Sequence, residues 1–441
     1  MRSSTLIKKL INVKDVTIKD IYFETNIMGE QDVIVLVELY KNRKCKCGIC
    51  GKQGSGYDRG DAFKRWRALD CGFVRVYIEC RMPRVVCPDH GVVAQKVPWA
   101  RHRSEFTTYF EEAVTWLARV SNKTVITEFM RINWRTVGSI IKRVYDEKGP
   151  TTEDLFGNLK NIGIDETSYK KGHKYLTIVV DHDTGSVIWV GVGKTSDTLD
   201  KFFKLLTTEQ LANIKVITAD GADYIAKSVG KWCPNAVICV DPFHVVCWIN
   251  DALDDVRKRL WREEMKKAEP KRKRKVGRPK KGEKISVKPT PAQTVKNLRY
   301  PLGKNPENLT PTQQVALELI VKSNPYLYKA YLLKEKLRLL FKLPIEDAIK
   351  VLDEWLVEAY TSEIPEMVKL QKTITEFKVK ILKSIELGLS NARLEGTNSQ
   401  IKIIIRMAYG FRNIDNLIAL IMLRCSTFDI DLPGRKPKII A

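Results

Sequence analysis

The sequence predicts a multidomain α/β protein built around a mixed five-stranded sheet. Three observations support this prediction: a β-β-β-α-β-α-β pattern over residues 160–241, a cysteine-containing β region before it, and an almost wholly helical region after it. A chain of 441 residues exceeds one ordinary domain, and its 44% hydrophobic content suffices for several cores. We therefore expect a small N-terminal zinc-binding β domain, a helix-turn-helix, and a sheet domain interrupted by an all-helical insertion.

The individual elements follow from hydrophobic periodicity. Residues 20–41 alternate as a strand pair with its turn at 29–32, and helical periodicity begins at residue 104. The expected sheet has strands 160–165, 174–181, 186–192, 214–219 and 236–241, with crossover helices near 197–206 and 222–231. Amphipathic helices are expected at 311–342, 345–361 and 364–386. The predicted segments are 1–100 (β and zinc), 101–150 (helix-turn-helix), 151–262 (first part of the sheet domain), 263–386 (helical insertion), 387–425 (second part of the sheet domain) and 426–441 (basic tail).

Charge is the strongest compositional signal. The formal net charge of +24 favours a polyanionic partner. Nucleic acid fits better than a membrane, because no apolar run reaches the ~18–20 residues that a spanning helix requires. The N-terminus lacks a signal-peptide core, so we expect a cytoplasmic protein that associates with the nucleoid when bound to DNA. Ten cysteines in such a chain indicate reduced thiols or metal ligands.

Three acidic residues form the candidate catalytic site. Asp165 and Asp220 each end an apolar, β-branched run, which places a carboxylate at the carboxyl end of a buried strand. Glu395 lies in a helical segment, on a polar stripe that also contains Asn391, Asn398 and Lys402. If the first and fourth strands are parallel neighbours, their aspartates converge, and three carboxylates suit Mg²⁺ or Mn²⁺. In a basic chain, this combination points to metal-dependent cutting or joining of DNA.

A structural alternative exists for each aspartate, because a single strand-end aspartate often caps a turn or a helix. Two neighbouring acids are left out of the site on local grounds. Asp181 ends a hairpin strand, and Glu166 faces away from Asp165 by strand alternation.

The cysteine region contains a C-x₂-C … C-x₂-H pattern typical of a zinc site. Cys47 and Cys50 are separated by 36 residues from Cys87 and His90. Two thiolate-containing pairs suit a structural, tetrahedral Zn²⁺ with no open position. The alternative is a group of unliganded reduced cysteines, and Cys45 is close enough to replace Cys47 as a ligand.

Two segments are candidates for DNA contact. Residues 121–146 have the pattern of a helix-turn-helix, whose second helix offers Arg135, Lys142 and Arg143 to phosphates or base edges. A helical hairpin with a purely packing role gives the same pattern. The basic loop 266–288 carries twelve Lys or Arg and two Glu. Within it, the stretch containing Lys275, Arg278 and Lys280 weakly resembles a minor-groove AT-hook, and a solvated basic loop is the preferred interpretation.

These motifs together resemble the DDE transposases of the ISL-three family of prokaryotic insertion sequences. The first block of resemblance is 163–166 followed by 171–175, the second is 220–224 followed by 241–246, and the third lies within 391–412. The match extends over about residues 45–425 with the expected domain order. It implies an RNase H-like catalytic domain, carried by the two parts of the sheet domain.

The resemblance also implies residue roles. Asp165, Asp220 and Glu395 correspond to the catalytic triad, and Asp241 and His244 to a supporting D-x-x-H motif. His244 is equally well explained as a buried core histidine. The implied activity is binding of terminal inverted repeats, metal-dependent cleavage and strand transfer into target DNA by a homo-oligomer on paired ends. Two alternatives remain: an RNase H-fold nuclease on branched DNA and a domesticated, non-catalytic DNA-binding protein.

Overall fold

A computed structural model describes residues 3–40, 45–267, 290–388, 392–407, 411 and 413–435; side chains are not described at 3–4, 321–323 and 392–395. The chain divides into two compact units, one containing residues 1–151 and 401–441 and the other residues 152–400. Among the described helices, none is long and apolar enough to cross a membrane.

The first unit begins with α1 (Ser3–Leu10) and two small sheets. The four-stranded sheet has the order β1-β2-β5-β4, with β1 (Val16–Thr25), β2 (Gln31–Leu39), β5 (Arg75–Arg81) and β4 (Phe63–Arg67). The three-stranded sheet has the order β3-β6-β7, with β3 (Ser55–Asp58), β6 (Arg84–Cys87) and β7 (Gly91–Ala94). Trp66 and Trp99 meet edge to face in the core of the larger sheet, with ring centroids 5.5 Å apart. The predicted strand pair at 20–41 is confirmed as β1 and β2.

Helices complete the first unit. They are α2 (Thr108–Val120), α3 (Lys123–Met130), α4 (Trp134–Lys148) and, from the far end of the chain, α17 (Ile414–Cys425). The side chain of Asn122 caps α3 by accepting from the backbone N of Val125 at 2.9 Å. Arg131, with φ of 51°, ends α3 in the left-handed conformation and turns the chain into α4. The helix-turn-helix predicted over residues 121–146 is therefore confirmed as α3 and α4. α17 packs against α4 and α2.

The second unit contains the mixed sheet, in the order β10-β9-β8-β11-β12. Its strands are β8 (Asn161–Lys170), β9 (Lys174–Asp181), β10 (Val187–Val192), β11 (Val216–Ala219) and β12 (Val237–Val240). β8, β9 and β10 pair antiparallel, whereas β8, β11 and β12 run parallel. The helices around it are α5 (Thr152–Phe156), α6 (Ser196–Phe203), α7 (Thr208–Asn213) and α8 (Asp223–Trp232). The presence of five strands and the parallel pairing of the first with the fourth agree with the sequence prediction. The predicted end of the first strand at residue 165 is wrong: β8 continues to Lys170, because residues 166–168 and 170 also pair with β9.

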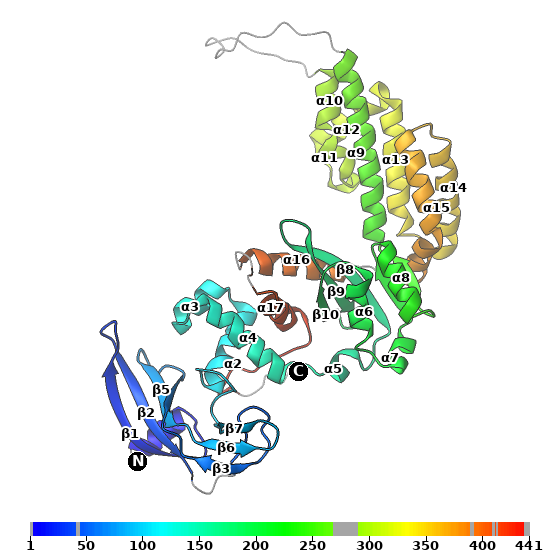
Figure 1. Cartoon of the computed structure of the whole chain (residues 1–441). Helices are drawn as coiled ribbons and strands as arrows, with labels where there is room; N and C mark the ends of the chain where they lie inside the picture. The colour runs from blue at the N-terminus through cyan, green and yellow to red at the C-terminus, as the bar shows by residue number, and fades with distance from the viewer. Residues whose placement is uncertain are drawn as a thin grey trace, which may run out of the picture. The chain divides into compact units, whose positions relative to one another are not determined.

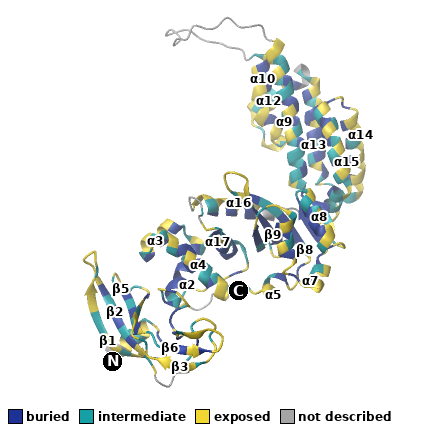
Figure 2. Ribbon diagram, viewed as in Figure 1, coloured by how far each residue is buried: buried dark blue, intermediate teal, exposed yellow. Residues whose placement is uncertain are grey.

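A helical bundle separates β12 from α16 (Ala392–Met407) in the sequence. It contains α9 (Pro242–Lys267), α10 (Pro291–Asn297), α11 (Arg299–Gly303), the 3₁₀ turn η1 (Pro306–Asn308), α12 (Pro311–Ser323), α13 (Pro325–Leu340), α14 (Ile345–Tyr360) and α15 (Pro365–Glu386). These helices pack side by side (Figure 1), and their buried residues form a shared core inside the bundle (Figure 2). The prediction of one helix over 311–342 is wrong. Asn324 caps a new helix and Pro325 occupies its first turn, so the segment divides in two.

Candidate active site, metal centre and DNA-binding helices

Strand register aligns three aspartates at one edge of the mixed sheet. β11 pairs with β8 so that Thr218 lies opposite Gly163, and two residues further along the two strands are Asp220 and Asp165. β11 pairs with β12 up to Ala219 and Val240, so the next residues are Asp220 and Asp241. Neighbouring strands lie about 4.8 Å apart, which brings these carboxylates to adjacent positions. Asp220 and Asp241 directly follow β11 and β12, whereas Asp165 lies within β8.

The side chains are close enough to influence one another electrostatically. The pKa of Asp165 is raised, first by burial and further by the negative charges of Asp220 and Asp241. A hydrogen bond from the backbone N of Glu166 and the charge of His244 act in the opposite direction. A buried group of like charges is unfavourable alone, and a bound divalent cation relieves that repulsion.

Two of the aspartates also shape the chain that follows them. An oxygen of Asp220 accepts from the backbone N of Ala222 at 3.0 Å, and Gly221, with φ of +90°, supplies the left-handed conformation for this turn. An oxygen of Asp241 accepts from the backbone N of Phe243 at 3.0 Å, at the start of α9. The capping role considered from the sequence is therefore present, and it fixes the orientation of both carboxylates.

α16 supplies a contact to this group that the sequence did not reveal. The amide nitrogen of Asn398 donates to Asp165, and Asn398 is only 6% exposed. The other amide atom, Oδ1 of Asn398, is buried without a hydrogen-bond partner among the described residues. Asn398 lies three residues after Glu395, on the polar stripe expected from the sequence. Glu395 itself falls on α16, but its side chain lies outside the described residues.

Glu166 lies at the border of the carboxylate group. It is half-buried and accepts a hydrogen bond from the hydroxyl of Tyr224 on α8. Burial raises the pKa of Glu166, and Asp220 and Asp165 raise it further. Its side chain is thus engaged by Tyr224 and remains within electrostatic range of Asp220. Asp181, by contrast, accepts from the backbone of the β9–β10 turn at Asp183, as expected of a hairpin residue.

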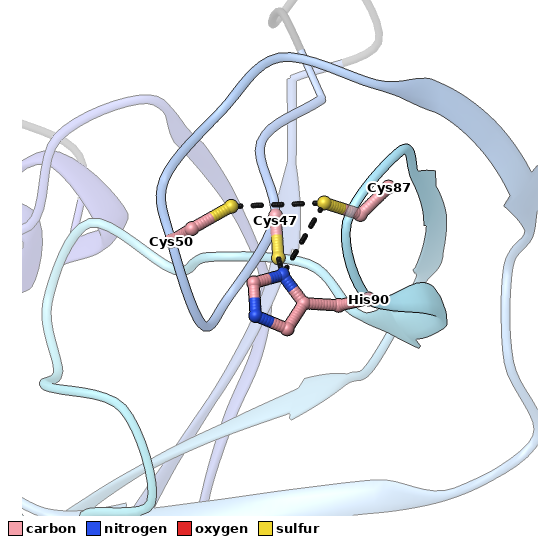
Figure 3. A group of neighbouring side chains, drawn as sticks. All are labelled: Cys47, Cys50, Cys87 and His90. Carbon is pink, nitrogen blue, oxygen red and sulfur yellow. Dashed lines mark hydrogen bonds between the residues drawn. The ribbon is translucent and has the colours of Figure 1, made fainter.

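The cysteine–histidine group assembles as the spacing predicts (Figure 3). The ligand atoms of Cys47, Cys50, Cys87 and His90 all lie within 4.8 Å of one another. The Cys50 and Cys87 sulfurs are 3.6 Å apart, and Nδ1 of His90 is 3.5 Å from Cys87 and 3.9 Å from Cys47. A tetrahedron with Zn–S bonds of about 2.3 Å has edges of about 3.8 Å, so these side chains fit a zinc ion. Cys45 is not part of the group.

The backbone around Cys47 and Cys50 favours the thiolate form of Cys47 and fixes the position of their loop. Burial raises the pKa of Cys47, but hydrogen bonds from the backbone of Cys50 and Ile49 outweigh it and lower the pKa to about 7. Gly48 has no room for a side chain, because a Cβ there would lie 2.6 Å from the carbonyl oxygen of Ala94. This close approach ties the first ligand loop to the strand β7 that follows the second pair.

The three predicted DNA-contacting residues of α4 differ in their surroundings. Arg135 is exposed in the first turn of the helix. Lys142 pairs with Asp146 at 2.7 Å, and Arg143 binds the fully buried Glu111 at 2.6 Å. Lys123, at the start of α3, is buried against the rings of Trp134 and Phe411, and burial lowers its pKa to about 8. Lys275, Arg278 and Lys280 lie outside the described residues.

Comparisons with known proteins agree with this geometry. A family model described as "Transposase" matches residues 162–421, and one described as "Helix-turn-helix domain of transposase family ISL3" matches residues 95–145. The chain is 43% identical over 441 residues to the transposase for insertion sequence element IS1557 of Mycobacterium tuberculosis, covering 99% of this chain and 98% of that protein. It is 26% identical over 353 residues to the transposase for insertion sequence element IS1001 of Bordetella parapertussis, covering 79% of this chain and 81% of that protein. The resemblance seen in the sequence is thereby confirmed: the chain belongs to the ISL3 family of DDE transposases.

Proposed function

We propose that this transposase binds the terminal inverted repeats of an insertion sequence, cleaves the DNA at the element ends and transfers the liberated 3′-hydroxyl to target DNA. The alignment of Asp165, Asp220 and Asp241 on three parallel strands, with α16 held against Asp165 by Asn398, is the observation that supports it most. The strand order, with three antiparallel strands followed by two parallel ones, supports an RNase H-like catalytic domain.

Asp165, Asp220 and Glu395 are the proposed catalytic triad and the ligands of Mg²⁺ or Mn²⁺. These side chains would hold the divalent ions, which when bound would supply activation of the attacking oxygen and stabilisation of the leaving oxygen of a phosphodiester. Asn398 orients Asp165 for this role, since its amide nitrogen holds one carboxylate oxygen. Asp241 and His244 act as supporting groups: Asp241 caps α9, and the ring nitrogen Nε2 of His244 lies 4.0 Å from its carboxylate.

The N-terminal modules are proposed to recognise the element ends. Cys47, Cys50, Cys87 and His90 hold a structural Zn²⁺ that fixes the β6–β7 turn against the first ligand loop. α4 reads the major groove, with Arg135 toward the bases and Lys142 toward phosphates, while Arg143 holds Glu111 of α2 and so fixes α4 in place. The basic loop 266–288 adds affinity that does not depend on sequence. A homo-oligomer pairs the two ends.

One cleavage assay tests this proposal. Purified protein is incubated with Mg²⁺ and labelled duplexes carrying the element end, and cut and joined products are mapped. Asp165→Asn, Asp220→Asn and Glu395→Gln are expected to abolish cleavage while end binding persists. Asp181→Asn is the matched control, because Asp181 belongs to the same sheet but holds a hairpin turn that asparagine also supports. Normal cleavage by any of the first three variants would remove that residue from the site.

The range of DNA substrates that the protein binds and cuts distinguishes the transposase from the two alternatives, a nuclease on branched DNA and a non-catalytic DNA-binding protein. Cleavage of branched DNA regardless of end sequence would favour a structure-specific nuclease. Specific end binding without cleavage under any metal condition would favour a non-catalytic regulator.

A further inference from the structure

A basic groove lies where the four-stranded sheet meets the helix-turn-helix. It has a volume of about 670 Å³ and is lined by Lys64, Arg65 and Arg67 of β4, Arg75 of β5, and Arg131 between α3 and α4. Among its described lining residues, Glu105 is the only acid. The groove also reaches Asn133 and Thr136, at the first turn of α4. All of these residues belong to the first unit.

The acids that pair with these arginines stand outside the groove lining. Arg75 binds Asp32 at 2.8 Å and Glu30 at 2.7 Å, and Arg65 binds Glu24 at 2.8 Å and also Glu79. None of these four acids is among the groove-lining residues. Such pairs hold a planar guanidinium in a fixed orientation and balance part of its charge from outside the groove. The side chains that line the groove itself are therefore basic, with the exception of Glu105.

One acid, Asp70, joins the two walls of the groove. Its carboxylate binds Arg67 from the sheet and Arg131 from the helix-turn-helix. Arg67 is 5% exposed and lies 5.6 Å from the ring of Tyr77, and its Nε–H is buried with no acceptor among the described residues. A buried donor without a partner next to a cationic groove is typical of a site that awaits an anion.

The position of the groove relative to α4 suggests which anion this is. In helix-turn-helix proteins, the first residues of the second helix contact base edges, so the DNA backbone passes beside that end of the helix. The N-cap residue Asn133 makes no side-chain capping bond, although its carbonyl oxygen accepts from the N–H of Thr136 at 3.0 Å. The N–H groups of Trp134 and Arg135, which precede Thr136 in this 15-residue helix, are therefore available to a phosphate. Resting on the proposed function, we propose that the groove binds the phosphate backbone of element-end DNA beside the bases that α4 reads.

Salt dependence gives this proposal a measurable signature. Each phosphate contact contributes about 0.9 to the slope of log K against log salt, which corresponds to about 8-fold in affinity at 0.1 M salt. A phosphate contact carries no sequence information. Removing one should therefore weaken binding to any duplex by the same factor, whereas removing a base contact weakens binding to the repeat alone.

The experiment measures Kd from about 0.05 to 0.2 M KCl for two duplexes of equal length, one with the terminal repeat and one scrambled. Lys64→Gln has the least structural risk, because no described carboxylate pairs with Lys64. It should lower the slope by about 0.9 and weaken both duplexes about 8-fold at 0.1 M salt; adding Arg131→Gln should roughly double the slope change. Lys19→Gln, on β1 of the same sheet but outside the groove, is the matched control and should bind normally.

Asp70→Asn separates a phosphate contact from a structural effect. It keeps both cations and removes the carboxylate between them. If Arg131 acts only by holding the fold, Asp70→Asn should weaken binding as much as Arg131→Gln does, and that result would overturn the proposal. The proposal would also be overturned if Lys64→Gln and Arg131→Gln left the slope of log K against log salt unchanged, whether or not the wild-type protein prefers the repeat duplex.

If the wild-type protein bound the repeat and scrambled duplexes equally, the proposed function would be refuted. Binding to the scrambled duplex would still test whether the groove contacts phosphates.

Discussion

Asn398 allows the sharpest test of how the carboxylate site is assembled. It extends from α16, the helix that carries Glu395, and its amide nitrogen donates to the carboxylate of Asp165. Asn398→Leu keeps the side-chain volume nearly constant and removes the donor. A hydrogen bond to a charged group contributes about 1.5–3 kcal/mol. If that energy orients Asp165 in the transition state, cleavage should slow by about 10- to 150-fold, since 1.4 kcal/mol corresponds to tenfold.

The stability of the variant should change much less than its activity. Leucine removes the hydrogen bond to Asp165, which destabilises the fold, but it also removes the buried Oδ1 that has no described partner. Because these two effects are of similar size and opposite sign, we expect the free energy of unfolding to stay nearly constant while cleavage falls. Single-turnover cleavage over a Mg²⁺ titration and chemical denaturation measure the two quantities. Lys402→Gln, at an exposed position four residues further along α16, is the control.

Two outcomes would refute this reasoning. Wild-type cleavage across the Mg²⁺ titration would mean that Asn398 does not orient Asp165. A loss of cleavage that matches a loss of folded protein would mean that Asn398 is only a packing residue.

Three further expectations concern the first unit. Cys87→Ala should release the metal and lower the melting temperature of the unit, whereas Cys45→Ala should retain one equivalent of zinc by metal analysis. Burial lowers the pKa of Lys123 from 10.5 to about 8, so between these pH values Lys123 is deprotonated in the folded state but still protonated in the unfolded state. The free energy of unfolding should therefore rise with pH between about 8 and 10.5. Lys123→Met should remove that rise and add about 1–3 kcal/mol to the free energy of unfolding at neutral pH, because nearby aromatic rings offset part of the burial cost. Arg135→Gln should reduce the preference for the terminal repeat over scrambled DNA, as measured by the ratio of the two Kd values.

The parts of the site that depend on strand pattern could be predicted from the sequence. One apolar run, within β8, ends in Asp165, and the run that forms β11 is followed by Asp220; a helical crossover makes the two strands parallel. The cysteine–histidine group followed from ligand spacing alone. In both cases residues close together in the sequence determine which side chains can meet. Neighbouring strands, and the short loops that carry the C-x₂-C and C-x₂-H pairs, have few alternative geometries.

Features that depend on contacts between residues far apart in the chain could not be predicted from the sequence. Arg143 was expected to face DNA, but the structure pairs it with Glu111, 32 residues away and fully buried. The break at Pro325, by contrast, had a local signal: a proline inside a helical pattern ends the helix before it, and apolar periodicity on both sides led to a single predicted helix. The contact of Asn398 with Asp165 depends on how α16 is rotated about its own axis. The polar stripe of α16 indicates which face is polar, but it does not determine which residue of that face meets Asp165.

The same limit explains why the role of α17 could not be predicted. Its residues 419–423 are buried in succession, so no polar face shows which neighbours it meets. Gly138 of α4 permits close approach, because a Cβ there would lie 2.6 Å from the side chain of Asn416. Arg424 donates to the carbonyl oxygens of Ala118 and Ser121 at the end of α2, where a positive charge is favourable. The DNA-binding unit is therefore built from both ends of the chain, and a fragment that ends after α4 lacks the helix that covers its core.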